Sequence, residues 1–530
     1  LGEFGMNSLL LETGEDRLLI DAGQMFPEWD NGVERLVPDY RRLGRGRMRG
    51  ILLTHGHEDH IGSLAEALSW SPAPVFGTPF TLGLARGGLS EAGIDGDLRA
   101  ITPGRAFEAG PFRVHPLKVA HSTPGSVAFV IEVAGLVILH TGDFKLAKTA
   151  PESERTDLAP FAEWGLRGVD LMLSDSTGAE TKGVTGHEDE VLAGVDAAFD
   201  EARGRVIATC FASSIPRIER IARIAGRRGR RIAFAGRRMA DNVALGRDLK
   251  LLSLEAEVMN LEDAVTSPRA DSEVVYFAAG SQAEPRSTLA RMAAGTHPLV
   301  KIQRGDLVLF SSRVIPGRDR IVSRLMARLI RAGAHVVHGA SSHVHVSGHA
   351  AAGELAELAA LVRPKAFVPV HGDLRLLAAH ARLVSEVTGG RSRTHVVENG
   401  DVMTVRADGV AFEERIEMPK RCIGVGLSGD LDEELLRQRH RLATGGIVTP
   451  VVYISAQTGR WARPSLVLTR GFLTGKLAAT VEGEIRDAVD LATREKPAEL
   501  RGEDLRGSVE VEVTRLLRRR YQLRPAVAPV

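Results

Sequence analysis

The chain has 530 residues, 44% of them hydrophobic, so it is too long for one core and is expected to form two to four domains. Its formal net charge of +1 excludes binding of nucleic acid through overall charge, so any such partner must contact local basic patches. Two cysteines, Cys210 and Cys422, exclude a disulfide framework and fit a reducing cytoplasm. Because the sequence starts at Leu1 without a methionine, we expect a few N-terminal residues to be missing.

The first 204 residues alternate short β-branched runs with helical patterns. Helices are predicted at 61–70 and 190–204. The apolar stretch 126–139 falls short of the ~18–20 residues of a membrane helix. It is broken by Glu132 and Gly135, so it predicts a strand hairpin. Strands are predicted at 17–23, 50–56, 74–78, 112–122, 136–144 and 170–177.

From Arg205 onward the alternation of strands and helices becomes regular. This βαβα pattern predicts a mostly parallel sheet in a separate domain at 205–343. The segment 344–418 continues with helix, strand and helix, and we assign it to the first domain. The Gly- and Arg-rich stretch 419–446 is predicted to be a linker, and 447–530 a small domain with two strands and two charged helices.

Histidines and carboxylates gather in the stretch "LTHGHEDHIGSL", directly after an apolar run. His55 and His57 are spaced to point two imidazoles at one spot, while Asp59 and His60 can reach a second spot a few ångströms away. Imidazole and carboxylate ligands suit zinc or manganese. The motif H-x-H-x-D-H therefore predicts two metal ions side by side, and not merely a polar turn that caps a helix.

Two metal ions need more ligands than one turn can provide, and further candidates follow other predicted strands. Alone, each of them is more often a structural residue. Together they favour a single site, because active sites of layered α/β folds collect at strand ends. The candidates are His121, Asp143 with His140 nearby, Asp21 and His371.

These motifs resemble the metallo-β-lactamase fold, and the long insertion between Asp175 and His349 resembles its β-CASP subgroup, which acts on nucleic acids. Within that subgroup the chain is similar to the bacterial ribonuclease J family along essentially its whole length. It departs within "FASSIPRI", where family members often carry Asn-Ile-His. The shared segments are "GEFGMN", "LTHGHEDHIGSL", "HTGDFK", "SDST", "FASS", "GSQAEP", "HVHVSGH" and "PVHGD".

The resemblance implies an α/β chain with an αββα metallo-β-lactamase sandwich, formed by 1–204 and 344–418. A parallel-sheet β-CASP domain at 205–343 is inserted into it, and a small α+β C-terminal domain follows the linker. It also implies two divalent metal ions per chain, zinc or manganese. His55, His57 and His121 would hold one ion. Asp59, His60 and His371 would hold the other, Asp143 would bridge both, and Asp21 would orient a ligand imidazole.

The implied reaction is hydrolysis of RNA phosphodiesters to 5′-phosphate and 3′-hydroxyl products. His349 is the candidate acid that protonates the leaving oxygen, with Asp175 holding its imidazole and Asp59 acting among the metal ligands. A histidine at the third β-CASP motif, here His371, is typical of members that act on RNA rather than DNA. The alternative for His349 is a structural imidazole in a Gly-Ser turn.

A 5′→3′ exonuclease that prefers 5′-monophosphate ends needs a pocket for one phosphate. Small donors after strands suit such a pocket, although the same serines could be ordinary helix N-caps. The candidates are Ser213, Ser214, Ser312, His345 and Ser347. The arginine-rich segment from Arg217 to Arg238 could contact the RNA backbone or form a solvated helix face.

The resemblance further implies endonuclease activity and roles in mRNA decay and rRNA maturation. The expected partners are single-stranded RNA with a 5′-monophosphate, a second or further copies of the chain in a homodimer or homotetramer, and other RNA-decay proteins, but no membrane. Three alternatives remain. They are a small-molecule hydrolase of the same fold, a β-CASP DNA nuclease, and a non-catalytic RNA-binding subunit.

Overall fold

The computed structural model describes residues 2–27, 32–44, 46–266, 273–284, 286–315, 317–339, 342–424, 430–494 and 503–530. Pro285 at the end of "GSQAEP", residues 425–429 of the predicted linker and residues 495–502 of the predicted C-terminal domain lie outside these ranges. The chain divides into two compact units. One comprises Leu1–Glu28 with Arg35–Arg421, and the other comprises Trp29–Glu34 with Cys422–Val530. Within the described ranges, no helix is both long and apolar enough to span a lipid bilayer.

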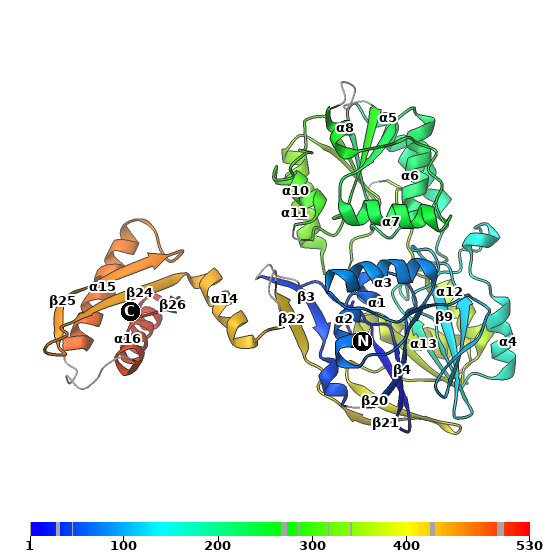
Figure 1. Ribbon diagram of the computed structural model, residues 1–530, viewed down its shortest axis with the longest axis horizontal. Helices are drawn as coiled ribbons and strands as arrows, with labels where there is room; N and C mark the ends of the chain where they lie inside the picture. The colour runs from blue at the N-terminus through cyan, green and yellow to red at the C-terminus, as the bar shows by residue number, and fades with distance from the viewer. Residues whose placement is uncertain are drawn as a thin grey trace. The chain divides into compact units, whose positions relative to one another are not determined.

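The larger unit contains a sandwich of two sheets (Figure 1). The first sheet has the order β1-β2-β4-β5-β6, and the second has the order β19-β18-β11-β10-β9-β8-β7. The first comprises β1 (Leu9–Thr13), β2 (Asp16–Ile20), β4 (Arg47–Leu52), β5 (Val75–Gly77) and β6 (Leu98–Ala100). The second comprises β7 (Phe107–Ala109), β8 (Phe112–Lys118), β9 (Val127–Val133), β10 (Leu136–His140), β11 (Leu171–Asp175), β18 (Ala366–Val370) and β19 (Arg393–Thr394).

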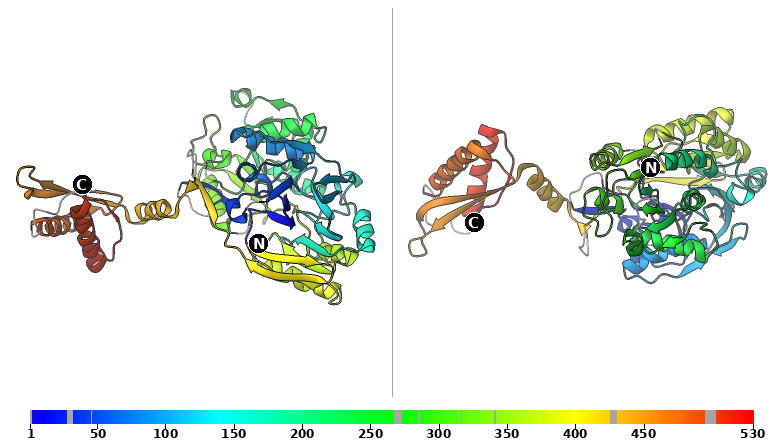
Figure 2. Two further views of the ribbon diagram at one scale, coloured as in Figure 1. Left: turned by 60° about the horizontal axis from the view of Figure 1, so that its bottom comes forward. Right: turned by 90° about the horizontal axis from the view of Figure 1, so that it is seen from above.

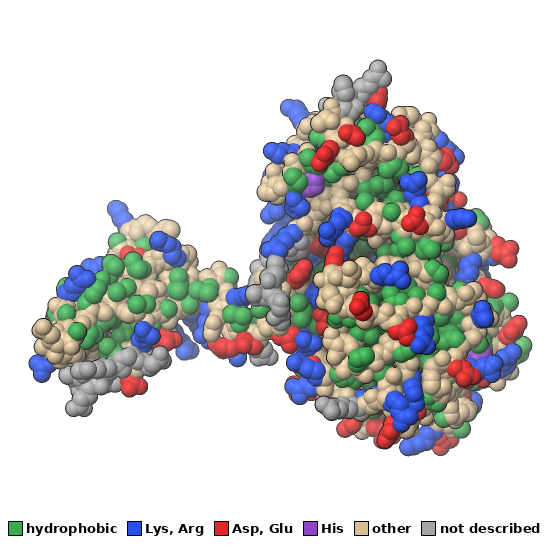
Figure 3. Space-filling view, in the orientation of Figure 1, with side chains coloured by type: hydrophobic (Ala, Val, Ile, Leu, Met, Phe, Trp, Pro, Cys, Tyr) green, Lys and Arg blue, Asp and Glu red, His purple; other side chains and the backbone are tan. Residues whose placement is uncertain are grey.

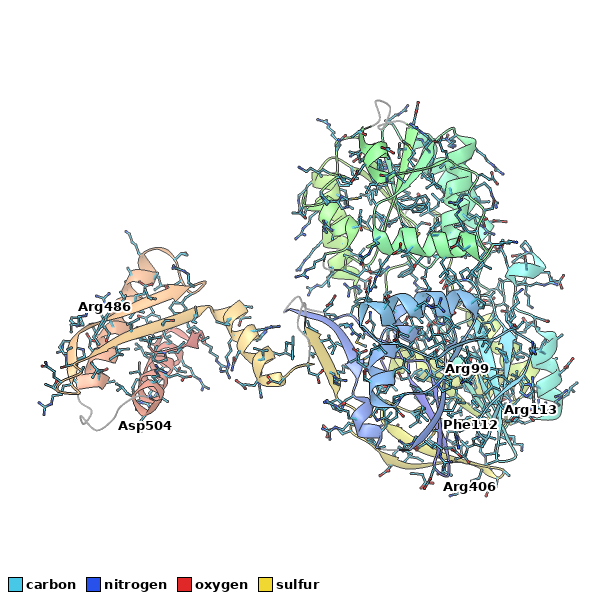
Figure 4. All side chains as sticks on the ribbon, in the orientation of Figure 1. Arg99, Phe112, Arg113, Arg406, Arg486 and Asp504 are labelled. Carbon is cyan, nitrogen blue, oxygen red and sulfur yellow. The ribbon has the colours of Figure 1, made fainter. Side chains whose placement is uncertain are left out.

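Apolar side chains from both sheets meet in one buried core. Leu52 of the first sheet packs there with Phe112 and Phe129 of the second (Figure 4 labels Phe112). Strands β9 and β10 pair as the predicted hairpin, with Leu136 opposite Val133. Burial of this contiguous apolar surface is what holds the two sheets together.

Helices cover the outer face of each sheet and complete the four-layer αββα arrangement predicted from the sequence. One set buries apolar residues against the first sheet, and the other does so against the second. The first set is α1 (Glu58–Ile61), α2 (Leu64–Trp70) and α3 (Pro79–Glu91). The second set is α4 (Ala159–Arg167), α12 (Ala352–Val362) and α13 (Leu374–Val387). The segments β3 (Val33–Pro38), β20 (Asp401–Arg406) and β21 (Gly409–Arg415) also belong to this part of the chain.

The inserted domain is built on a sheet of order β14-β13-β15-β12-β16-β17, and its described strand pairs are all parallel, as the βαβα pattern predicts. Helices bury apolar residues on both faces. The strands are β12 (Val206–Thr209), β13 (Arg231–Phe234), β14 (Val258–Met259), β15 (Val274–Ala278), β16 (Leu307–Phe310) and β17 (His335–His338). The helices are α5 (Leu192–Glu201), α6 (Ile215–Arg227), α7 (Arg237–Asp248), α8 (Leu261–Thr266), α10 (Thr288–Ala293) and α11 (Asp319–Arg331).

The C-terminal unit contains a long antiparallel pair, β24 and β25, with α15 and α16 on one face of it (Figure 2). Val448 and Ile485 are fully buried in the core between strands and helices. The segment assigned to a linker contains the helix α14 and short strands. The elements are β22 (Lys420–Gly424), β23 (Asp430–Leu431), α14 (Glu433–Gly445), β24 (Ile447–Ile454), β25 (Trp461–Arg470), α15 (Gly475–Arg494), α16 (Glu503–Leu516) and β26 (Ala526–Val527).

Candidate metal centre

The turn between β4 and α1 carries the first histidine cluster. Strand β4 ends at Leu52, and α1 begins at Glu58, so the intervening chain lies at the carboxyl end of a buried strand. His57 occupies the N-cap position of α1 but makes no capping hydrogen bond with its side chain. Its ring is therefore available for another purpose, and a helix cap does not explain this residue.

One group of donor atoms comes from His55, His57, His121 and Asp143. These atoms lie within 4.8 Å of one another. His57 Nδ1 lies 3.0 Å from Nε2 of His55 and 3.1 Å from Nε2 of His121. Asp143 Oδ2 lies 3.7 Å from the His55 nitrogen and 4.0 Å from the His121 nitrogen. Three imidazoles and one carboxylate thus converge on a single point.

A second group comes from Asp59, His60, His371 and the same Asp143. Asp143 Oδ2 lies 3.4 Å from His60 Nε2 and 3.5 Å from His371 Nε2. Asp59 Oδ2 lies 3.2 Å from the same nitrogen of His371. One carboxylate oxygen therefore belongs to both groups, and the structure brings together all seven residues that the sequence analysis proposed as ligands.

Hydrogen bonds on the far side of the rings fix which nitrogen faces the site. His60 Nδ1 donates to Asp21 Oδ2 at 2.7 Å, because a carboxylate can only accept. Thr54 donates its hydroxyl proton to the same Asp21 oxygen at 2.8 Å, so its oxygen accepts from Nδ1 of His55 at 3.0 Å. Both rings consequently point the lone pair of Nε2 into the site.

The two histidines that follow strands of the second sheet, His121 and His371, are oriented in the same way. His121 Nδ1 donates to the carbonyl of Gly348 at 2.7 Å. Thr177 donates to Asp175 Oδ1 at 2.7 Å, and its oxygen accepts from Nδ1 of His371, also at 2.7 Å. Both Nε2 lone pairs again point inward. So many lone pairs and carboxylates would repel one another unless a cation lay between them.

The donor set fits divalent metal ions. Ligands at ~2.0–2.2 Å on a tetrahedron stand roughly 3.3–3.6 Å apart. The donor pairs described above are 3.0 Å to 4.0 Å apart, which brackets that range, and all donors of one group lie within 4.8 Å of one another. Nitrogen and oxygen donors without sulfur suit zinc and manganese alike. The donor chemistry and spacing therefore indicate a divalent-metal site and leave the choice of metal open.

The backbone is held in an unusual conformation at two of these residues. Asp21 follows β2 with φ +61°, and His371 follows β18 with φ +56°. Non-glycine residues in this left-handed region cost about 1–3 kcal/mol each. Such strain persists where the surroundings demand one side-chain direction, and here the two side chains face His60 and Asp59.

The histidines of the two donor groups differ in the direction of their pKa shifts. Burial lowers the pKa of His57 to about 4, so this ring is neutral and able to bind a metal at pH 7. Burial opposes protonation of His371 as well, but the carboxylates of Asp143, Asp175 and Asp59 outweigh it and raise the pKa of His371 to about 10. A proton and a metal ion therefore compete for the second group, whose affinity must fall as pH falls.

His349 and Asp175 lie beside the metal ligands. His349 Nδ1 donates to Asp175 Oδ2 at 2.8 Å and lies 3.8 Å from Asp143 Oδ2. The other Asp175 oxygen accepts from the backbone N–H and the hydroxyl of Thr177. The side chain of His349 is 21% exposed, so it is accessible from solvent while its orientation is fixed.

The candidate phosphate-pocket residues lie on three segments. Ser213 and Ser214 follow β12, Ser312 follows the parallel neighbour β16, and His345 and Ser347 lie in the loop that leads to His349. Ser347 Oγ accepts from the backbone N–H of His349 at 3.1 Å. Across the described ranges, the hydroxyls of Ser213, Ser214 and Ser312 have no hydrogen-bond partner and remain available to a ligand.

Three residues at the site were not assigned from the sequence, although each lies in a quoted motif. Asn7 of "GEFGMN" donates to the carbonyl of Asp59 at 3.1 Å and lies 3.1 Å from Nε2 of His60. Thr177 of "SDST" joins Asp175 to His371. Lys145 of "HTGDFK" donates to the carbonyl of Ser347 at 3.0 Å. The motifs marked these positions, but only the fold shows their partners.

Carboxylates neutralise most of the arginine-rich segment 217–238. The pairs are Arg217 with Glu188, Arg220 with Glu154, Asp189 and Glu219, Arg223 with Glu255, Arg228 with Asp196 and Asp200, Arg231 with Glu273, Arg237 with Glu91, and Arg238 with Glu58 and Glu91. Two of these arginines, Arg217 and Arg220, are buried. The segment thus stabilises the domain through ion pairs, and it offers little free positive charge to a polyanion.

Family models match the chain in four consecutive stretches. The metallo-beta-lactamase superfamily matches residues 1–178, and the beta-CASP domain of ribonuclease J matches 203–329. A Zn-dependent metallo-hydrolase RNA specificity domain matches 333–397, and the ribonuclease J C-terminal domain matches 434–530. The fold and the paired donor groups thus define a metallo-β-lactamase-type hydrolase with a β-CASP insertion.

Relatives specify the family further. The chain is 33% identical to ribonuclease J of Synechocystis, with 99% of this chain and 84% of the relative covered. It is 34% identical to ribonuclease J of Thermus thermophilus, with 100% and 93% covered, and 34% identical to ribonuclease J2 of Bacillus subtilis, with 89% and 86% covered. The chain belongs to the ribonuclease J family, as the sequence motifs predicted.

The fold also occurs in a solved structure of a protein of unknown function from Enterococcus faecalis. That structure superimposes with a TM-score of 0.52 over 74% of this chain and 95% of its own, at 15% sequence identity. At this level of identity the likeness concerns the fold alone.

Proposed function

We propose that this metal-dependent ribonuclease hydrolyses RNA 5′→3′ from 5′-monophosphate ends and also cuts internally, releasing 5′-phosphate and 3′-hydroxyl products. One observation carries the proposal. The His349–Asp175 pair lies beside Asp143, the carboxylate that both donor groups share. A proton donor and a site for two cations would thereby lie around one reacting phosphate.

The first donor group would hold one cation, the second would hold the other, and Asp143 would bridge them. We expect zinc, with manganese as the alternative. Bound there, two divalent cations would offset the negative charge of the phosphodiester and acidify a water molecule. Asp21 and Thr54 would keep the rings of His60 and His55 in their ligating orientation.

The protein's own residues would manage the leaving group. When the bond between phosphorus and the ribose 3′-oxygen is broken, that oxygen leaves as an alkoxide unless it is protonated. Asp175 accepts from Nδ1–H of His349, so Nε2 of that ring is the atom that can pass a proton to this oxygen. Asp175 stays ionised in this role, because burial is outweighed by the neighbouring imidazoles, which lower the pKa of Asp175 below its ordinary value.

A terminal phosphate would bind at the edge formed by the carboxyl ends of β12 and β16 and the loop 343–349. The free hydroxyls of Ser213, Ser214 and Ser312, with Ser347 and His345, are small donors that suit one phosphate. A triphosphate needs room for two more phosphates. We therefore expect discrimination in favour of a monophosphate, and every cleavage regenerates such an end.

Three proposals about the cellular setting are suggested by the family. We propose that the protein acts in mRNA decay and rRNA maturation in the cytoplasm. We propose that it assembles as a homodimer or homotetramer. We also propose that it works with other RNA-decay proteins, while single-stranded RNA is its direct substrate.

The test compares RNA that carries a 5′-monophosphate, RNA that carries a 5′-triphosphate, circular RNA and DNA, each with and without added zinc or manganese. We expect metal-dependent cleavage of all RNAs, fastest on the monophosphate, and little cleavage of DNA. A double variant, Ser347→Ala with His345→Ala, should slow degradation from the monophosphate end and spare the circle. Equal losses on all RNAs would remove the pocket assignment, and equal cleavage of DNA would favour a DNA nuclease.

A further inference from the structure

Positive charge is concentrated in one part of the β-CASP domain. Between Arg286 and Gly339 the sequence holds ten Lys or Arg and two Asp or Glu, a formal charge of +8, whereas the whole chain carries +1. One of the two acids, Asp306, is buried and bound to Arg205 through both of its oxygens. Because Asp306 is already paired with a residue outside the segment, Asp319 is the one acidic residue left in it to offset the positive charge.

Helix α11 displays this charge on its outer face. Val322, Leu325 and Leu329 are buried at helical spacing against the sheet. The opposite face presents exposed arginines, and α10 and the segment between α10 and β16 add more basic residues. We call these residues the α11 basic face, and they are Arg291, Lys301, Arg304, Arg320, Arg324, Arg328 and Arg331. Figure 3 shows Lys and Arg side chains gathered along the edge of the domain where α10 and α11 lie.

None of these seven cations has a carboxylate partner within the described parts of the chain. This sets them apart from the arginines of 217–238, most of which are paired. Four arginines of like charge on one helix repel one another by a few tenths of a kcal/mol per neighbouring pair. A surface that tolerates this repulsion with no internal counterions is complementary to a polyanion.

The basic face is connected to the candidate phosphate pocket by a fixed loop. Strand β16 ends at Phe310, Ser312 follows it, and α11 starts at Asp319. Gln282 holds the intervening loop, because its side chain donates to the carbonyl of Arg313 at 2.8 Å and accepts from the N–H of Ile315 at 2.9 Å.

Arg313 bridges the two regions electrostatically. Burial and then Arg217 lower the pKa of His345 to about 3, and Arg313 contributes in the same direction, so its charge is felt in the pocket. From that loop, Arg320, Arg324 and Arg328 follow at intervals of four residues, roughly 6 Å along the helix axis, and Arg331 ends the helix. Exposed positive charge therefore runs from the pocket edge along α11.

We propose that the α11 basic face binds the phosphate backbone of RNA outside the catalytic site. The inference rests on the proposed ribonuclease function. Because the contacts are to phosphates, binding at this face is independent of base sequence and strongly dependent on salt. Its effect is to hold a long RNA near the site between cleavage events, and short oligonucleotides do not reach it.

The test uses the full chain and a triple variant, Arg320→Gln, Arg324→Gln and Arg328→Gln. Glutamine has a helix propensity close to that of arginine and removes only the charge. The matched control is Arg382→Gln, Arg486→Gln and Arg518→Gln. These three arginines are exposed, have no described ion-pair partner and lie elsewhere on the chain (Arg486 is labelled in Figure 4). Both variants lose the same net charge.

Binding is measured by fluorescence anisotropy with 3′-labelled, unstructured RNAs of roughly 30 and roughly 6 nucleotides, in chelator and across a salt series. Each lost phosphate contact lowers the salt slope for single strands by ~0.7. We expect a slope shallower by roughly 2 for the triple variant on the long RNA. The short RNA should bind as to wild type, and the control variant should match wild type on both.

An unchanged slope on the long RNA would overturn the proposal, as would an equal loss on both RNAs or an equal loss in the control. Cleavage of the short RNA with metal separates this failure from that of the proposed function. If wild type cleaves it but the triple variant keeps the wild-type slope, only the basic face is wrong. If wild type neither binds nor cleaves RNA, the proposed function falls as well.

Discussion

Arg217 holds His345 from the neighbouring helix, with Nη1 of the guanidinium 3.2 Å from Nδ1 of the imidazole. An arginine can only donate, so Nδ1 of His345 accepts, and the ring proton is on Nε2. The same Nη1 also reaches the carbonyl of Val344 at 3.4 Å, and Nη2 reaches that of Val346 at 3.3 Å. Arg217 therefore fixes both the path of this loop and the tautomer of the ring that it offers to a phosphate.

The same loop is held along its length by groups from the sandwich. Lys145 donates to the carbonyl of Ser347, His121 to that of Gly348, and Thr185 to that of His349 at 2.7 Å. The β-CASP helix α6, a candidate metal ligand and the candidate acid are thus joined through successive peptide groups. Displacement at one end of the loop would be felt at the other.

Arg217→Lys should therefore impair action from a 5′-monophosphate end more than internal cleavage. Lysine keeps the charge but cannot donate in the same fork to Glu188, Val344 and Val346. We expect kcat/KM on 5′-monophosphate RNA to fall by roughly 10- to 100-fold, equivalent to about 1.4–2.8 kcal/mol. Loss on a circular RNA should be smaller.

Arg220→Lys is the matched control for that variant. Arg220 is buried on the same helix and pairs with Glu154 and Asp189, away from the loop. It should lower thermal stability without changing the ratio of the two activities. If both variants changed this ratio equally, Arg217 would have no special role in positioning the loop.

The proximity of the seven candidate ligand side chains could be predicted from the sequence, because strand order decides where strand ends meet. Strands β10, β11 and β18 are parallel neighbours, with Asp175 opposite Val370, so residues at or just after their carboxyl ends must lie together. Asp143, Asp175 and His371 occupy those positions. A local motif combined with this rule leaves little freedom, whereas the αββα layers were expected from the family resemblance.

Partners distant in the sequence could not be predicted in this way. Lys145 meets Ser347 across 202 residues, and Asn7 meets Asp59 across 52. Nothing in the arginine-rich run shows that Arg217 binds Glu188, because neutralising carboxylates come from other segments. Helix α14 was missed for a local reason. Charged residues dominate this helix, and few of its apolar residues are buried, so the sequence shows no clear apolar periodicity.

Substitutions at the ligands should remove metal ions in a pattern set by the shared carboxylate. Asp143→Ala should lose both ions, because its Oδ2 belongs to both donor groups. His60→Ala should lose only the ion of the second group. Elemental analysis of the purified proteins, as metal per chain, measures this. His140→Asn is the control, since that buried histidine accepts from the N–H of Gly142 and belongs to neither group. Loss of both ions in all three variants would indicate general unfolding.

Asp175→Asn should lower turnover while leaving metal content and RNA affinity close to wild type. The amide can accept through its oxygen or donate through its nitrogen, so it no longer holds His349 in one tautomer as the acceptor-only carboxylate does. General acid catalysis contributes ~10²–10⁴-fold, so we expect kcat of the Asp175→Asn variant to fall by a factor in that range. The double variant Asp175→Asn with His349→Gln should lose no more than the two single losses combined. Asp170→Asn, at the start of the same strand and paired with Lys365, should retain wild-type kcat. If the Asp175→Asn variant lost metal instead, Asp175 would be a metal ligand.

Acid should weaken the interface between α6 and the sandwich through Glu188. Burial opposes ionisation of this carboxyl, but Arg217 and then Lys145 hold the pKa of Glu188 below its ordinary value. A lowered pKa in the folded state means that the stabilisation is complete above the unfolded value of ~4.3 and is lost as pH falls through the folded value. Glu188→Gln should therefore destabilise the larger unit at pH 7, by up to ~3–5 kcal/mol for a broken buried pair, and should flatten its loss of stability below about pH 4.3. Calorimetric unfolding from pH 7 to pH 3 measures both effects.

Glu357→Gln, which breaks an exposed pair with Lys148, should cost no more than ~1 kcal/mol and leave the acid limb unchanged. If the Glu188 variant lost stability with acid as steeply as wild type, the coupling of Glu188 to Arg217 and Lys145 would not contribute to the acid limb.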